Sequence, residues 1–239
     1  MQYQGGKALL SKFFAPILRE ALAQTPGAAY IEPFVGGFNV LPRVDPSRET
    51  PVLCSDVHPG LITLYREISR GWEPPDSVSR EEYATVKARG DWSDPLTAFV
   101  AFGCSFGGKE WGGYARSNQG QDYCGGAKRA LAKKRPWIER AHLEHLSYLD
   151  LTPPAGSVVY CDPPYEGTTG YRTGTFDQGT FRAWCEGLAG HGCRVFVSEF
   201  EGACPATWGV VWRHERLLRL DKVVGEKRAT RVEILAEVR

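Results

Sequence analysis

The sequence lacks the features of a membrane or secreted protein. No apolar run approaches the roughly 18 residues that a membrane-spanning helix needs. Residues 1–12 contain glycines and lysines but no apolar core followed by a cleavage site. The seven cysteines are odd in number and show no CxxC spacing, and there are only five histidines. These absences favour a protein of the reducing cytoplasm, with no metal and no disulfide framework.

The sequence also lacks an excess of charge. Its 29 basic and 28 acidic residues give a formal net charge of +1, whereas nucleic-acid-binding domains are usually strongly basic. The net charge therefore argues against a nucleic-acid partner, unless it is the sum of a basic patch and an acidic patch in different parts of the chain. Apolar residues make up 42% and charged residues 24% of the 239 positions. This excludes a disordered or fibrous chain and allows one large domain, with or without an insertion.

The hydrophobic pattern predicts an α/β domain that is interrupted in the middle. Its first part has a helix over 9–24, strands over 28–34 and 52–56, and a helix over 59–70. Helices are predicted over 79–87, 95–102 and 127–146, in a segment rich in glycine and aromatic residues. Strands return from residue 157, with a helix over 178–189, a strand over 194–198, and strands over 210–220 and 230–238 joined by a charged loop. We expect a mainly parallel sheet over 1–71 and 150–239, with an inserted domain over 72–149.

Asp162, Pro163, Pro164 and Tyr165 directly follow an apolar strand, at the edge where open α/β sheets bind ligands. The prolines fix their own φ angles and supply no N–H groups, so the loop carbonyls are held outward. A carboxylate and a carbonyl can accept the two N–H bonds of a planar amino group while a ring stacks on its heterocycle. The four residues together therefore predict a site for such a group rather than a simple rigid turn.

Two further segments indicate a nucleoside site with an anionic group. Residues 32–37 (EPFVGG) end the first predicted strand, and Asp56 ends the second, where an acid can bind two ribose hydroxyls. The glycines do not fit the GxGxxG spacing of NAD proteins. Residues 3–7 (YQGGK) precede a helix, so their N–H groups and lysine suit a carboxylate or a phosphate. Alone, this last segment also fits a flexible tail.

The chain resembles the Dam-type DNA adenine-N6 methyltransferases. The resemblance rests on five features in this order: YQGGK, EPFVGG, Ser55-Asp56, an insertion and YCDPPY. The resemblance runs from Tyr3 to about Ser198, and more weakly to the C-terminal RVEIL. It implies a Rossmann-like seven-stranded methyltransferase sheet with an inserted, mainly helical target-recognition domain. It also implies S-adenosylmethionine as methyl donor, double-stranded DNA as partner, and direct in-line attack by the N6 amine of a flipped adenine.

The resemblance assigns roles to individual residues. Asp162 would be shared between the methionine end of the cofactor and the target amine, and Asp56 would bind the ribose. The chain departs from the family at Gly36-Gly37-Phe38, where Gly-x-Gly is usual. The implied catalytic residues are Asp162, Pro163, Pro164 and Tyr165, and the implied cofactor residues are Tyr3, Gly6, Lys7, Glu32, Pro33, Phe34, Gly36, Asp56 and Asp162.

The insertion is where DNA contacts are expected. Eight basic residues stand against three acidic ones between Lys109 and Arg140, a local balance of +5, which suits contacts to phosphates. Lys109, Tyr114 and Arg116 are the expected DNA contacts, in a glycine-hinged loop or hairpin. The alternative for residues 128–140 is a solvated helix face.

Several other functions stay open. Cytosine-N4 methylation uses the same chemistry, although its enzymes more often carry Ser in place of Asp162. A non-catalytic DNA-binding relative of the fold is possible, whereas the glycine spacing disfavours an NAD-dependent oxidoreductase. Restriction–modification, phage protection and epigenetic marking are all compatible with the residues, and a monomer is the expected state.

Overall fold

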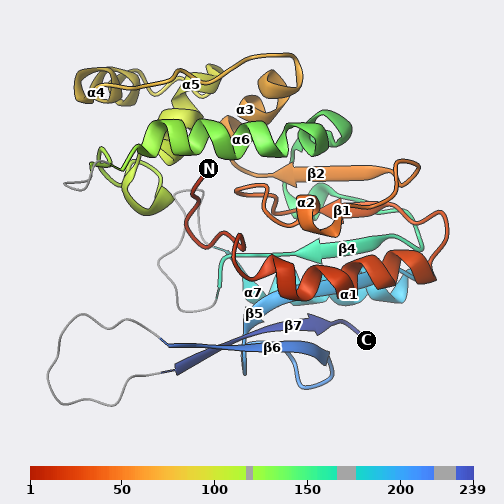
Figure 1. Ribbon diagram of the computed structural model, residues 1–239. Helices are drawn as coiled ribbons and strands as arrows, with labels where there is room; N and C mark the ends of the chain where they lie inside the picture. Colours follow the sequence, from red (N-terminus) through yellow and green to blue (C-terminus); the bar gives the residue numbers. More distant parts are fainter. Residues whose placement is uncertain (117–120, 166–175, 218–229) are drawn as a thin grey trace, which may run out of the picture.

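Seven strands form one sheet at the centre of the molecule (Figure 1). The computed structural model describes residues 1–116, 121–165, 176–217 and 230–239. The strands are β1 (Tyr30–Glu32), β2 (Val52–Asp56), β3 (His142–His145), β4 (Val158–Cys161), β5 (Arg194–Phe200), β6 (Gly209–Leu217) and β7 (Thr230–Glu237). Their order is β3-β2-β1-β4-β5-β7-β6, and among these strands only β7 runs opposite to the others, pairing antiparallel with β5 and β6. The predicted mixed α/β fold with a seven-stranded, mainly parallel sheet is confirmed.

The strand order reverses beside β1, and this creates the edge at which a ligand can bind. β1 pairs in parallel with β2 on one side and with β4 on the other. In open α/β sheets, ligands bind at the carboxyl ends of the strands at such a reversal. Glu32 ends β1, Asp56 ends β2 and Asp162 follows β4. Three acids from distant parts of the sequence therefore meet at this edge.

The two faces of the sheet pack against different helices. Tyr160 of β4 belongs to a core shared with α1 (Ser11–Gln24) and α3 (Pro59–Ser69), whereas its neighbours Val159 and Cys161 pack with α7 (Gln178–Gly190). Figure 1 shows α1 and α7 on opposite sides of the sheet. This alternation is the two-residue period of a strand, and it makes Cys161 a packing residue on the face opposite Tyr160.

The segment expected to be an insertion packs directly on the sheet domain. It contains α4 (Arg80–Arg89), α5 (Pro95–Ala98), the π-helical turn η1 (Phe99–Gly103), the 3₁₀ turn η2 (Phe106–Gly108) and α6 (Tyr123–Arg140). Val86, Phe99 and Leu131 belong to the same hydrophobic cluster as Leu61 of α3 and Phe14 of α1. Its helical character agrees with the pattern, and its core is continuous with that of the sheet.

The prediction of one helix over 127–146 is wrong at both ends. α6 begins earlier, at Tyr123, because the Asp122 carboxylate caps it by accepting from the Gly125 N–H (2.8 Å). It ends at Arg140, and β3 then pairs with β2 at the edge of the sheet. β3 is short and its outer residues are exposed polar side chains, so the sequence carries little strand signal there. β3 therefore belongs to the sheet although it lies within 72–149.

Smaller elements complete the fold. The sequence pattern gave no signal for α2 (Leu41–Val44) or for the 3₁₀ turn η3 (Tyr148–Asp150). Residues 218–220 of the predicted strand over 210–220, and the charged loop after it, lie outside the described residues. None of the helices in the described ranges has the length and apolar character needed to cross a membrane.

Candidate functional site

A cavity of about 640 Å³ lies at the carboxyl ends of β1, β2 and β4. We call it the central cavity. It brings together residues from the N-terminal segment, the glycine turn, β2 and the loop after β4. The sequence-predicted residues that line it are Tyr3, Gly6, Lys7, Glu32, Pro33, Phe34, Gly36, Asp56, Asp162, Pro164 and Tyr165.

Lys7 and Asp162 form an ion pair in this cavity. The Lys7 Nζ lies 2.7 Å from Asp162 Oδ1 and 4.4 Å from the centre of the Tyr165 ring. It also donates to the Gly5 carbonyl (3.0 Å). Burial raises the pKa of Asp162, and the Lys7 ammonium opposes that shift. Lys7 therefore favours the charged carboxylate at a position where burial alone would neutralise it.

Glu32 and Asp56 differ in how they are held. Glu32 is 2% exposed and accepts a hydrogen bond from the Tyr30 hydroxyl (2.8 Å). Burial raises its pKa to about 8, so it is neutral at pH 7. The Asp56 oxygens accept from the N–H groups of Gly36 and His58, both at 2.9 Å, while burial raises the pKa of Asp56 to about 6. Asp56 thus fixes the glycine turn beside the cavity.

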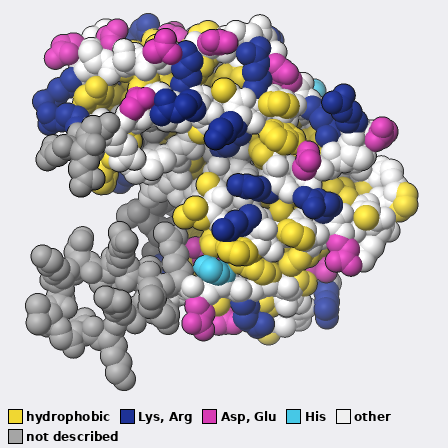
Figure 2. All heavy atoms as spheres, in the orientation of Figure 1, with side chains coloured by type: hydrophobic (Ala, Val, Ile, Leu, Met, Phe, Trp, Pro, Cys, Tyr) yellow, Lys and Arg dark blue, Asp and Glu magenta, His cyan; other side chains and the backbone are white. Residues whose placement is uncertain are grey.

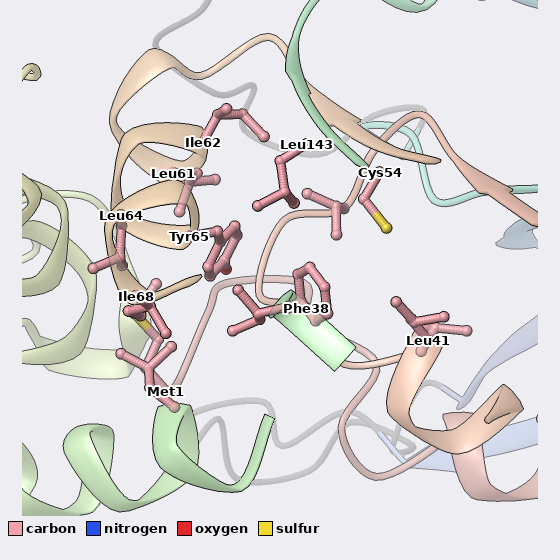
Figure 3. Close-up of a cluster of buried hydrophobic side chains, with 14 of the residues drawn as sticks. Met1, Phe38, Leu41, Cys54, Leu61, Ile62, Leu64, Tyr65, Ile68 and Leu143 are labelled. Carbon is pink, nitrogen blue, oxygen red and sulfur yellow. The ribbon is translucent and has the colours of Figure 1, made fainter. Parts of the chain in front are cut away.

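The absence of side chains at Gly36 and Gly37 leaves space for the Tyr3 side chain. A Cβ on Gly36, which has φ +45°, would lie 2.8 Å from the Tyr3 ring, and one on Gly37 would lie 2.7 Å from the Tyr3 Cβ. Phe38 has a φ of 56° and is fully buried. Its ring packs edge-on against Tyr65, with centroids 5.1 Å apart (Figure 3). The departure from Gly-x-Gly therefore adds volume to the core and leaves the cavity open.

A second hollow, which we call the outer groove, adjoins the central cavity at Asp162 and Tyr165. It has a volume of about 1190 Å³, and its lining includes Pro163, Phe200 and Glu233. The Tyr165 ring packs edge-on against Phe200, with centroids 4.7 Å apart. Both Asp162 and Tyr165 line the cavity and the groove. Molecules bound in the two hollows would meet at these two side chains.

The structure separates the three expected DNA contacts. Lys109 and Arg116 are exposed. Tyr114 is half-buried: its hydroxyl donates to the Val78 carbonyl (2.8 Å), and its ring packs against Tyr83. Tyr114 therefore holds the segment together, and its ring is not displayed as an open stacking surface.

The basic residues of α6 are largely engaged within the protein. Lys134 donates to the Gly37 carbonyl (2.6 Å) and to Asn39 Oδ1 (2.7 Å), which ties α6 to the glycine turn. Lys128 pairs with Asp76 (2.7 Å), and Arg140 donates to the Pro46 carbonyl (2.7 Å). On the face shown in Figure 2, basic side chains are interspersed with acidic and apolar ones. Lys134 and Arg140 thus hold α6 to the rest of the protein, whereas Arg129 and Lys133 of the same helix are exposed.

Several residues that the sequence reasoning missed also line the central cavity, and four of them are Val57, His58, Glu110 and Tyr148. Tyr148 faces Phe34, with ring centroids 5.4 Å apart, so the two give the cavity an aromatic side. Glu110 lies in the segment expected to contact DNA. The position of Val57 directly after Asp56 was the only available signal, because the other three depend on tertiary contacts.

The curated proteins described below, to which the chain is similar, are all named DNA adenine methylase. No family model matches it. A DNA adenine methylase of Salmonella typhi is 26% identical over 243 residues, covering 87% of this chain and 82% of the relative, and one of Salmonella typhimurium matches equally. The Retron Ec67 DNA adenine methylase of Escherichia coli is 28% identical over 180 residues, 64% of this chain and 60% of its own length. The chain is similar to these proteins over most of its length.

Proposed function

We propose that the chain is an adenine-specific DNA methyltransferase that transfers a methyl group from S-adenosylmethionine to the N6 amine of adenine. The relatives named DNA adenine methylase support adenine methylation in DNA. The observation that carries the proposal is the position of Asp162 and Tyr165, which line both the central cavity and the outer groove. A donor in the cavity and an amine in the groove would meet there.

The chemistry of the central cavity fits the proposed donor. When bound, S-adenosylmethionine supplies an electrophilic methyl group on a positively charged sulfur. Among the described lining residues, acidic side chains outnumber basic ones, which suits a ligand with a sulfonium and an ammonium group. Lys7 would bind its carboxylate and Asp56 its ribose. The aromatic side formed by Phe34 and Tyr148 suits its adenine ring.

The loop after β4 would hold the acceptor. The Pro164 carbonyl accepts from Gln178 Nε2 (2.9 Å), whereas Pro163 lines the outer groove. Asp162 and the Pro163 carbonyl would accept the two N6 hydrogens, and the Tyr165 ring would stack on the base. This directs the nitrogen lone pair toward the methyl group and stabilises the positive charge that develops on nitrogen. No covalent enzyme intermediate is needed.

The adenine must leave the duplex to reach this loop, since its N6 is inaccessible inside the stack. The outer groove, of about 1190 Å³, is large enough for a nucleotide. We propose that residues 72–149 supply target recognition, with the exposed Lys109 and Arg116 contacting phosphates. Tyr114 would act indirectly, by fixing that segment.

The test is methyl transfer by an Asp162→Ala variant. Transfer of labelled methyl from S-adenosylmethionine to unmethylated DNA should fall by at least about 100-fold, while the fold and most of the cofactor affinity are retained. Asp150→Ala is the matched control, because Asp150 is exposed and outside the cavity lining. Transfer at the wild-type rate by the Asp162 variant would refute the assignment.

A further inference from the structure

The glycine-rich loop between η1 and α6 forms a wall of the central cavity. The Gln4 N–H donates to the Gly108 carbonyl (3.0 Å), and a Cβ on Gly108 would lie 2.5 Å from the Gln2 carbonyl carbon. The loop is also tied down by the Trp111 N–H, which donates to the Ala101 carbonyl (3.0 Å). These contacts hold the loop against the segment that carries Tyr3. A residue of this loop that faces the cavity is therefore well placed to bind the ligand.

Glu110 is that residue. Its side chain is 16% exposed, and its Oε2 lies 3.8 Å from His58 Nε2. Burial lowers the pKa of His58 to about 4, so its ring is neutral at pH 7. His58 Nδ1 accepts from the Leu61 N–H (3.4 Å), so the ring proton is on Nε2 and faces Glu110. The neutral His58 ring therefore places no positive charge beside Glu110.

Glu110 and Asp56 lie at the same end of the cavity, because His58 touches both. The His58 backbone N–H donates to Asp56 Oδ1, while the His58 ring faces Glu110. Each Asp56 oxygen already accepts one backbone N–H, which reduces its remaining capacity as an acceptor. One acceptor site remains on each oxygen, and a second carboxylate at this end of the cavity would let each of the two neighbouring ribose hydroxyls donate to a different side chain.

We propose that Glu110 is a second ribose-binding carboxylate, which accepts a hydrogen bond from one ribose hydroxyl of S-adenosylmethionine while Asp56 accepts from the other. The inference rests on the proposed function and extends it. The glycine-rich loop would then also bind the cofactor, although the sequence pattern of this segment suggested DNA contact alone.

The experiment compares Glu110→Ala and Glu110→Gln with the wild type in calorimetric binding of S-adenosylmethionine and S-adenosylhomocysteine. Both ligands have the same ribose, but only the first has the sulfonium charge. A lost hydrogen bond to a charged group predicts that Glu110→Ala weakens both ligands by the same factor, about 10- to 100-fold. Glu110→Gln, which keeps an acceptor oxygen, should lose less. Glu81→Ala, which removes an exposed carboxylate of α4 outside both hollows, should bind like the wild type.

The outcomes separate the inference from the proposed function. If the wild type binds neither ligand, the proposed function is contradicted, and the inference with it. If the wild type binds both and the two Glu110 variants bind equally well, only the inference is overturned. A loss confined to S-adenosylmethionine would also overturn it, because Glu110 would then act through the sulfonium charge. If Glu110→Gln unfolds at the same temperature as the wild type, a change in its affinity reflects binding and not a loss of folding.

Discussion

The buried Glu32 should make the stability of the protein fall as the pH rises toward neutrality. Burial raises its folded pKa to about 8 from a usual value of 4.5. The folded state therefore binds the proton more tightly than the unfolded state between these two values. Stability conferred by this proton is present below the unfolded pKa and is lost as the pH rises through the folded pKa.

The size of this effect follows from a difference of one proton. When the folded state binds one proton more than the unfolded state, the free energy of unfolding falls by about 1.4 kcal/mol for each unit of pH increase. Between about pH 5.5 and about pH 7.5, Glu32 should lower the free energy of unfolding by about 2–3 kcal/mol. Glu32→Gln removes the ionisation but keeps an oxygen that can accept from the Tyr30 hydroxyl. Relative to the wild type, the variant should gain that amount over the interval.

Urea unfolding at the two pH values measures the difference directly. Asp56, whose pKa is raised to about 6, titrates in both proteins and cancels from the comparison. The exposed Glu20 provides the control substitution, Glu20→Gln, which should leave the pH profile unchanged. Parallel profiles for the wild type and Glu32→Gln would refute the reasoning. Burial and the negative charge of Glu233 raise the pKa of Asp162, and a neutral Glu32 adds no negative charge of its own to that of Glu233, so the result bears on the mechanism.

Two further substitutions test the contacts around the cavity. Lys7→Ala should slow methyl transfer at pH 7 by about tenfold and move the acidic limb of the pH–rate profile to higher pH, because Lys7 no longer opposes the raised pKa of Asp162. An unchanged acidic limb, or an equal effect of the exposed Lys12→Ala, would contradict this. Gly108→Ala should destabilise the protein by about 1–3 kcal/mol more than Gly107→Ala in urea unfolding. Both glycines have positive φ, but a Cβ meets the backbone of residue 2 only at Gly108, with nothing within 4 Å at Gly107. Equal losses would show that this close approach does not matter.

The sequence predicted the parts of the site that depend on strand ends. Parallel strands place their carboxyl ends at one edge of the sheet. The two short apolar runs before Asp56 and Asp162 therefore sufficed to predict that these residues lie close together. The aromatic, glycine and lysine residues near the N-terminus were predicted beside them, and the structure places Lys7 2.7 Å from Asp162. The pairing itself was not predictable, because nothing local fixes a contact across some 150 residues of chain.

The predictions failed where tertiary contacts decide. β3 is a short, polar edge strand whose only strong signal is its pairing with β2. Composition gave no sign that Lys134 and Arg140 of α6 bind backbone carbonyls more than 90 residues away in sequence. The glycines near Glu110 indicated a turn without indicating which surface it covers.

The most direct test of the account identifies the methylated nucleoside. Unmethylated double-stranded DNA is incubated with the protein and labelled S-adenosylmethionine, digested to nucleosides and analysed by mass spectrometry, with Asp162→Ala in parallel. The account predicts labelled N6-methyladenine with the wild type and none with the variant. Labelled N4-methylcytosine, or no labelled nucleoside with a wild type that binds the cofactor, would contradict it.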